Sequence, residues 1–222
     1  MEKRALLIDF DGTLVDSEVV HYESWQHVLS PFDINYSEQA FCIEFAGVPT
    51  LQAATVIKAR HNLDVSAQWL CEQKNQQFVL TSEQVKPRLL AGVKAFLNAA
   101  KQHFTLVLVT GSTRNEAIPV LTHYELLDLF STTICKDDVI NPKPDPEPYL
   151  KALEHLSIKP QEAFALEDSA TGLQSASVAG VQTVVISHEY SKSQDHSQAS
   201  YIANDISEAW EYIQKNTYIE TI

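Results

Sequence analysis

Two aspartates, Asp9 and Asp11, follow directly after a short apolar run in this sequence of 222 residues. An apolar run like that at residues 5–8 is typical of a buried strand, so both carboxylates are expected near its carboxyl end. Like charges at this spacing repel, and a buried carboxylate without a partner raises its pKa or destabilises the fold. The pair therefore indicates a bound divalent cation, because a cation would stabilise both carboxylates.

Two later apolar runs also end in polar side chains. Thr110, Gly111 and Ser112 follow the run at 104–109, and Glu167 and Asp168 follow the run at 164–166. Between these runs, Lys143 lies in a proline-rich stretch. In open α/β sheets, ligands bind beyond the carboxyl ends of the strands. Acids, a hydroxyl and an amine at that edge would suit Mg²⁺ together with a phosphate group.

Apolar runs alternate with helical patterns over much of the chain. The predicted strands are residues 5–8, 104–109, 164–166 and 181–186, and the predicted helices are 92–103, 115–127, 146–156, 170–179 and 206–215. Few polar residues interrupt the strands, as in parallel sheets that are covered on both faces. This pattern predicts a doubly wound, Rossmann-like α/β fold with a mainly parallel sheet. The polar stretch at residues 187–200 is predicted to be a surface loop by composition.

Residues 16–86 interrupt this alternation, because they contain helical patterns and no convincing strand. The helical patterns lie at residues 18–29, 38–45, 51–60 and 67–80, and Ser37, Thr50 and Ser66 stand where N-caps are expected. We therefore predict a small α-helical domain at residues 16–86, inserted into an α/β core formed by residues 1–15 and 87–222.

The composition excludes several classes of protein. The formal net charge of −13 disfavours nucleic-acid or membrane-surface binding, although the local field of a metal can still favour an anionic substrate. Three widely spaced cysteines match no zinc pattern and suit a reducing compartment. No apolar stretch is long enough to span a bilayer. The sequence predicts a cytoplasmic protein, with a monomer as the default.

Four motifs together resemble the haloacid dehalogenase-like (HAD) superfamily. They are DFDGTLVDSE at residues 9–18, VTGS at 109–112, KPDPEPY at 143–149 and LEDSATGLQSA at 166–176. Their order and spacing are similar to the branch with a helical cap after the first motif, which includes β-phosphoglucomutases and sugar-phosphate phosphatases. The resemblance covers residues 9–176, and the helical insertion lies where that branch has its cap.

The resemblance assigns roles in phosphoryl transfer to four of these residues. It implies that Asp9 is the nucleophile, which forms an aspartyl-phosphate. Asp11 matches the general acid that protonates the leaving oxygen and later the base that activates water. Thr110 matches the hydroxyl that binds the phosphoryl group, and Lys143 matches the cation that neutralises charge.

The resemblance also implies the phosphate and metal ligands. The backbone N–H of Gly111 would help to bind phosphate, and Ser112 belongs to the same phosphate-binding stretch. Mg²⁺ would be bound by the side chain of Asp9, the backbone carbonyl of Asp11, Asp168 and Glu167. Asp9 and Asp11 could instead be simple turn formers before a glycine, but the other three motifs argue against this interpretation.

The predicted cap contributes three residues that bear on the substrate. His21 and Lys74 match cap residues near the hinge and the substrate, although both could equally be ordinary helix side chains. Thr50 stands where β-phosphoglucomutases have an arginine that binds the distal phosphate of a bisphosphate intermediate. A threonine cannot provide that cationic contact. Arg114, just after the second motif, could partly substitute for it.

The sequence therefore predicts a Mg²⁺-dependent phosphatase acting on a small phosphorylated metabolite such as a sugar or polyol phosphate. Two alternatives remain open. One is a hexose phosphomutase similar to β-phosphoglucomutase, and the other is a non-catalytic binding protein with the same fold. The intact motif residues argue against the second.

Overall fold

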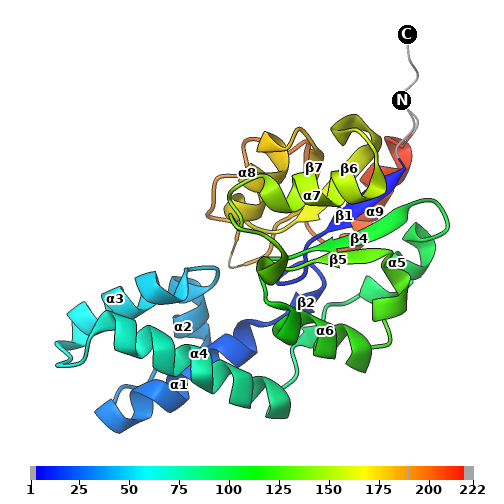
Figure 1. Ribbon diagram of the computed structural model, residues 1–222. Helices are drawn as coiled ribbons and strands as arrows, with labels where there is room; N and C mark the ends of the chain where they lie inside the picture. The colour runs from blue at the N-terminus through cyan, green and yellow to red at the C-terminus, as the bar shows by residue number, and fades with distance from the viewer. Residues whose placement is uncertain (1–3, 190, 218–222) are drawn as a thin grey trace. The chain divides into compact units, whose positions relative to one another are not determined.

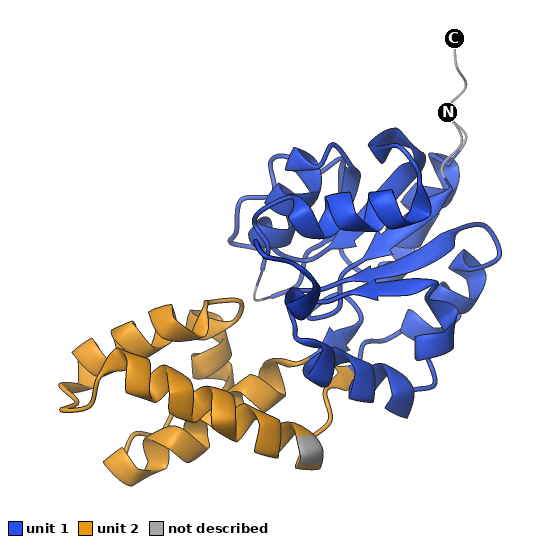
Figure 2. Ribbon diagram, viewed as in Figure 1, with its two compact units in different colours: residues 1–16, 89–222 blue, residues 17–88 orange. Residues whose placement is uncertain are grey.

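The computed structural model describes residues 4–189 and 191–217, and it divides into two compact units. One consists of residues 1–16 and 89–222, and the other is Ser17–Arg88 (Figure 2). The first is the α/β unit and the second is the helical unit. Each contains its own buried apolar side chains.

The α/β unit contains a parallel sheet, as the buried apolar runs predict. In the described part of the chain this sheet has six strands in the order β5-β4-β1-β6-β7-β8. Their bounds are β1 Ala5–Ile8, β4 Thr105–Val109, β5 Thr132–Ile134, β6 Ala163–Glu167, β7 Gln182–Ile186 and β8 Tyr201–Ala203. Every neighbouring pair is parallel, so these carboxyl ends share one edge. β2 (Val15–Asp16) and β3 (Arg88–Leu89) form a separate small sheet.

Helices cover both faces of the sheet (Figure 1). They are α5 Val93–Ala100, α6 Arg114–His123, α7 Glu147–Leu156, α8 Ala170–Val178 and α9 Ile206–Lys215, with short 3₁₀ turns at η2 Leu127–Leu129, η3 Lys136–Asp138 and η4 Pro160–Glu162. Successive strand residues point to opposite faces. In β1, Leu6 and Ile8 therefore pack with α5, α6 and α9, whereas Ala5 and Leu7 pack with α7 and α8.

The helical unit forms from α1 Glu18–Leu29, η1 Ser30–Phe32, α2 Glu38–Phe45, α3 Thr50–His61 and α4 Ala67–Gln84. α4 packs against both α1 and α3. Ser37 and Ser66 cap α2 and α4 as predicted, since their hydroxyls accept hydrogen bonds from the N–H groups of Ala40 and Trp69. The predicted cap at Thr50 is wrong, because Pro49 holds the N-cap position and Thr50 is the first helical residue.

The polar stretch between β7 and β8 is a loop with many exposed residues, as predicted, but two of its described residues are buried. Ser191 and His196 are only 1% and 7% exposed. The Ser191 hydroxyl accepts a hydrogen bond from the N–H of His188 at 3.2 Å, which turns this part of the loop inward. The composition therefore predicted the loop but not the burial of these two residues.

Across the described residues, no single helix is long and apolar enough to cross a membrane. The bent pair formed by α2 and α3 passes the same test by length and composition only.

Candidate active site

The sheet topology brings the predicted site residues to one edge. β1 lies between β4 and β6, where the strand order reverses. Ile8 is in register with Leu108 and Leu166, so Asp9 follows β1 at the level where the neighbouring strands also end. The carboxyl ends beside such a reversal are the usual ligand-binding position in open α/β sheets.

Three carboxylates meet at this position. Asp9, Glu167 and Asp168 are buried and offer ligand atoms that all lie within 4.8 Å of one another. Burial, together with Glu167, Asp168 and Asp11, holds the pKa of Asp9 well above its usual range despite the nearby Lys143 ammonium. Burial likewise raises the pKa of Glu167. Ionised carboxylates this close together need a cation.

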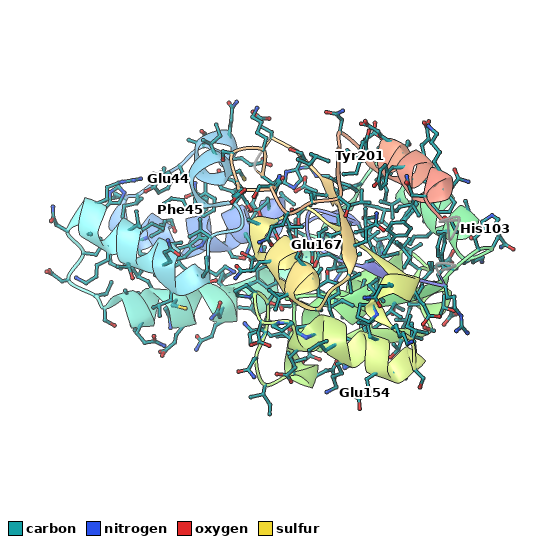
Figure 3. All side chains as sticks on the ribbon, turned by 90° about the horizontal axis from the view of Figure 1, so that it is seen from above. Glu44, Phe45, His103, Glu154, Glu167 and Tyr201 are labelled. Atoms are coloured by element: carbon teal, nitrogen blue, oxygen red, sulfur yellow. The ribbon has the colours of Figure 1, made fainter. Side chains whose placement is uncertain are left out.

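The donor set fits a hard divalent cation. It consists of carboxylate oxygens, the ligands that Mg²⁺ prefers. One of them, Oε2 of Glu167, is buried and has no hydrogen-bond partner among the described residues. Figure 3 shows Glu167 in the interior next to α8, whereas Glu154 on α7 points outward. An unpartnered buried carboxylate oxygen is costly unless something else binds it.

Lys143 provides the buried positive charge of the cluster. Its Nζ donates hydrogen bonds to Oδ1 of Asp9 and Oε1 of Glu167, each at 2.6 Å, and to the carbonyl of Val109 at 2.8 Å. Burial alone would lower the pKa of Lys143, but Asp9 and Glu167 outweigh it and raise the pKa. The side chain is only 7% exposed, so the ammonium is held between the two carboxylates.

Sequence reasoning missed Tyr149, which also binds the cluster. Its hydroxyl donates to Oε1 of Glu167 at 2.5 Å. Burial and the charge of Glu167 raise the pKa of Tyr149 well above its usual value, so the hydroxyl keeps its proton and remains a donor. The only sequence signal was its place at the end of the KPDPEPY stretch, which says nothing of this contact.

The loop after β4 supplies further polar groups. The Thr110 hydroxyl accepts a hydrogen bond from the N–H of Ser112 at 2.9 Å. Ser112 in turn donates through Oγ to Oδ2 of Asp11 at 2.5 Å. Ser112, which the sequence assigned to phosphate binding, therefore contacts the second aspartate. Gly111 is exposed.

This edge of the sheet joins a buried carboxylate beside a fixed ammonium, a second carboxylate held by a hydroxyl, and a cluster suited to a cation. A family model for haloacid dehalogenase-like hydrolases matches residues 6–186, which include all of these groups. This chain belongs to the haloacid dehalogenase-like hydrolase family. The predicted α/β fold and the predicted family are thereby confirmed.

The chain is also similar to individual proteins, both in sequence and in fold. The chain is 31% identical to a phosphorylated carbohydrates phosphatase from Thermotoga maritima, over 81% of this chain and 83% of that protein. It is 25% identical to a beta-phosphoglucomutase from Bacillus subtilis, over 82% of each chain. The fold is similar to that of a predicted phosphoglycolate phosphatase from Haemophilus somnus, with a TM-score of 0.83, 22% identity and coverage of 98% and 99%.

Arg114 lies apart from the hydrogen bonds that connect the hydrolase cluster. Its guanidinium pairs with Asp138 at 2.6 Å and donates to the hydroxyl of Thr133 at 3.1 Å. The side chain is 46% exposed. In this structure the Arg114 guanidinium therefore binds Asp138 and Thr133.

His21, Lys74 and Thr50 belong to the helical unit. Nζ of Lys74 lies 2.8 Å from Nδ1 of His21 and 4.4 Å from the ring centre of Phe78. Burial and the neighbouring Lys74 charge lower the pKa of His21 well below its usual value, so neutral His21 accepts from Lys74. Two of the three predicted cap residues are therefore hydrogen-bonded to each other.

Gly172, in the first turn of α8, leaves room for Glu167. A Cβ at this position would lie only 1.9 Å from Oε2 of Glu167. Gly172→Ala should therefore lower the free energy of unfolding by about 1–3 kcal/mol through overpacking, even though alanine favours helices. Urea unfolding of purified protein measures this change.

Gly111→Ala is the matched control, because an added Cβ there meets nothing within 4 Å. It should change the same free energy by less than about 0.5 kcal/mol. Equal stability of the Gly172→Ala protein and the unmutated chain would contradict the packing described for Glu167.

Proposed function

We propose that this hydrolase is a Mg²⁺-dependent phosphatase that removes phosphate from a small phosphorylated sugar or polyol through an aspartyl-phosphate on Asp9. The observation that carries the proposal is the buried Lys143 ammonium, 2.6 Å from both Asp9 and Glu167 at the carboxyl end of β1. An ammonium in this place stabilises a phosphoryl group that meets Asp9, since it offsets the negative charge of both.

Asp9 acts as the nucleophile. A carboxylate oxygen of Asp9 attacks phosphorus, a new O–P bond forms, and the bond from phosphorus to the leaving oxygen breaks. Water then attacks phosphorus, and cleavage of the O–P bond restores the Asp9 carboxylate. Lys143 is charged before the reaction begins, because Asp9 and Glu167 raise its pKa.

Asp11 moves the protons. It donates one to the leaving oxygen in the first step and accepts one from water in the second. The hydrogen bond from Ser112 to Oδ2 of Asp11 supports this role, since it orients the carboxyl group beside the loop that follows β4.

Thr110 and Gly111 bind the phosphoryl oxygens. Thr110 is 2% exposed and directly follows β4, and Asp9 directly follows the neighbouring strand β1. The Thr110 hydroxyl and the backbone N–H of Gly111 donate to the phosphoryl group as charge develops on it.

Asp9, Glu167, Asp168 and the backbone carbonyl of Asp11 are the proposed ligands of Mg²⁺. The ion, when bound, neutralises charge where the phosphate meets these carboxylates. The close carboxylate cluster and the unpartnered oxygen of Glu167 support this assignment.

Magnesium should stabilise the folded protein. At a free Mg²⁺ concentration about 100 times its Kd, the free energy of unfolding should rise by about 2.7 kcal/mol. Thermal unfolding with EDTA and with added Mg²⁺ measures this change. Asp168→Asn should lose most of the gain, because it removes a charged ligand. A gain of equal size in Asp168→Asn would contradict this metal site.

The relatives support the proposed substrate class. A relative named as a phosphorylated carbohydrates phosphatase supports a phosphorylated sugar or polyol. We propose that the helical unit, Ser17–Arg88, is the cap that selects the leaving group, with Lys74, His21 and Thr50 as its candidate substrate-binding residues.

Phosphate release from a panel of phosphorylated sugars, polyols and other small phosphorylated metabolites tests the function. Release that needs Mg²⁺ and stops with EDTA is the expected result. Absence of release from the whole panel, with Mg²⁺ binding retained, would favour a non-catalytic binding protein.

A hexose phosphomutase is the second candidate, because a β-phosphoglucomutase is among the relatives. Two observations favour the phosphatase. Thr50 carries no charge with which to hold a second phosphate, and the Arg114 guanidinium is paired with Asp138. Incubation with glucose 1-phosphate and a trace of glucose bisphosphate distinguishes the two. A phosphatase releases inorganic phosphate, whereas a mutase yields glucose 6-phosphate with little free phosphate.

A further inference from the structure

The loop between β7 and β8, residues 187–200, contacts the carboxyl end of β6. Nε2 of His188 lies 2.8 Å from Oδ2 of Asp168. Farther along the loop, Oε1 of Gln194 accepts a hydrogen bond from the N–H of Ala170 at 2.8 Å, at the start of α8. The loop therefore contacts Asp168 itself and the first residue of the helix that follows it.

The backbone N–H and carbonyl of His188 form hydrogen bonds with nearby loop residues. Its N–H donates to Oγ of Ser191, and its carbonyl accepts from the N–H groups of Ser191 and Lys192 at 3.0 and 2.9 Å. Ser191 is only 1% exposed. The loop is anchored at both ends by hydrogen bonds from Ser187 to Ala203 and from Ser200 to Thr183. These backbone hydrogen bonds position His188 beside Asp168.

The backbone at Gly12 lies close to the same oxygen, Oδ2 of Asp168. A Cβ at Gly12 would lie 2.1 Å from Oδ2 of Asp168 and 3.1 Å from Nε2 of His188. Oδ2 is therefore enclosed between the backbone of the first motif and the imidazole. This arrangement restricts rotation of the Asp168 carboxylate, which belongs to the buried acidic cluster.

We propose that His188 is a positioning residue that orients Asp168 for Mg²⁺ binding. In the Nε2-protonated form its ring donates to Oδ2, so the carboxylate does not need to rotate when the ion binds. Hydrogen bonds to a ligating carboxylate tune the affinity of a metal site, and their loss typically costs about 10–100-fold. The inference rests on the proposed function, because it assumes the magnesium site described above.

Two substitutions separate the hydrogen bond from the bulk of the side chain. His188→Ala removes the donor, whereas His188→Gln keeps an amide N–H at a similar distance from the backbone. His155→Ala is the matched control, because His155 is an exposed histidine on α7. Circular dichroism and urea unfolding verify that each variant is folded.

Isothermal titration of Mg²⁺ into each protein, without substrate, is the test. We expect His188→Ala to raise the Kd for Mg²⁺ by about 10–100-fold, and His188→Gln and His155→Ala to stay within about threefold of the unmutated chain. In phosphate-release assays, His188→Ala should need correspondingly more Mg²⁺ for half-maximal rate. Its kcat at saturating Mg²⁺ should recover to within a few-fold.

The outcomes that overturn this inference differ from those that overturn the proposed function. Equal Mg²⁺ affinity in folded His188→Ala and the unmutated chain would overturn the role of His188 alone. The same holds for a kcat that excess Mg²⁺ does not restore, or for a weakened Kd that His188→Gln does not rescue. No Mg²⁺ binding by the unmutated chain would overturn the proposed magnesium site and this inference with it.

Discussion

Asp9→Asn is expected to lower phosphate release by at least about 10⁴-fold. An amide is a poor nucleophile, and loss of the nucleophile from a hydrolase that works through a covalent intermediate costs on the order of 10⁴–10⁶ in kcat. The fold should not suffer, because burial and the nearby Glu167 already disfavour the charged form of Asp9. Urea unfolding in EDTA should therefore give at least the stability of the unmutated chain.

Steady-state phosphate release with Mg²⁺ and the preferred substrate measures the effect of Asp9→Asn. The matched control is Asp128→Asn, since Asp128 is an exposed aspartate in η2 of the same unit. The control should retain full activity. Retention of more than about 1% of the activity in Asp9→Asn would mean that another group attacks phosphorus.

Lys143→Met is expected to impair both stability and activity. The substitution keeps an unbranched side chain but leaves Asp9 and Glu167 buried without their shared ammonium. Removal of one partner from a buried ion pair typically costs about 3–5 kcal/mol in the free energy of unfolding. Loss of a charge that stabilises the transferring group should lower kcat by about 10²–10³-fold.

Urea unfolding in EDTA and in Mg²⁺ separates the two effects of Lys143→Met. Magnesium should restore part of the lost stability, because it also neutralises the carboxylates, but it should not restore kcat. Lys94→Met is the control, since Lys94 is exposed on α5, and it should change neither quantity. Unchanged stability of Lys143→Met in EDTA would contradict the buried contacts of Lys143.

The secondary structure was predictable where apolar periodicity is strong. Residues 5–8, 18–29, 38–45 and 206–215 form the elements expected from the sequence. The edge strands β5 and β8 were missed because each is only three residues long, and neither is a continuous aliphatic run, since β5 contains two threonines and β8 one tyrosine. Such strands owe their conformation to the neighbouring strand, which the local sequence does not encode.

The site was predictable as a set of positions but not as a set of contacts. Parallel strands bring their carboxyl ends to one edge, so the place of Asp9 and Thr110 follows from strand order alone. The hydrogen bonds from Ser112, Tyr149 and His188 depend on how loops from distant parts of the chain pack together. His188 was the hardest to foresee, because it lies in a loop whose composition is typical of a solvent-exposed segment.

The central claim is that the phosphoryl group passes through Asp9, and a rapid-quench experiment tests it most directly. Protein mixed with substrate and Mg²⁺ is stopped in acid on the time scale of one turnover and then treated with borohydride. An aspartyl-phosphate is reduced to homoserine, which mass spectrometry of the peptide that contains residue 9 detects. We predict homoserine at position 9 only when substrate and Mg²⁺ are both present. Complete turnover with the carboxylate of Asp9 unmodified at every time point, or a reduced residue elsewhere in the chain, would contradict the claim.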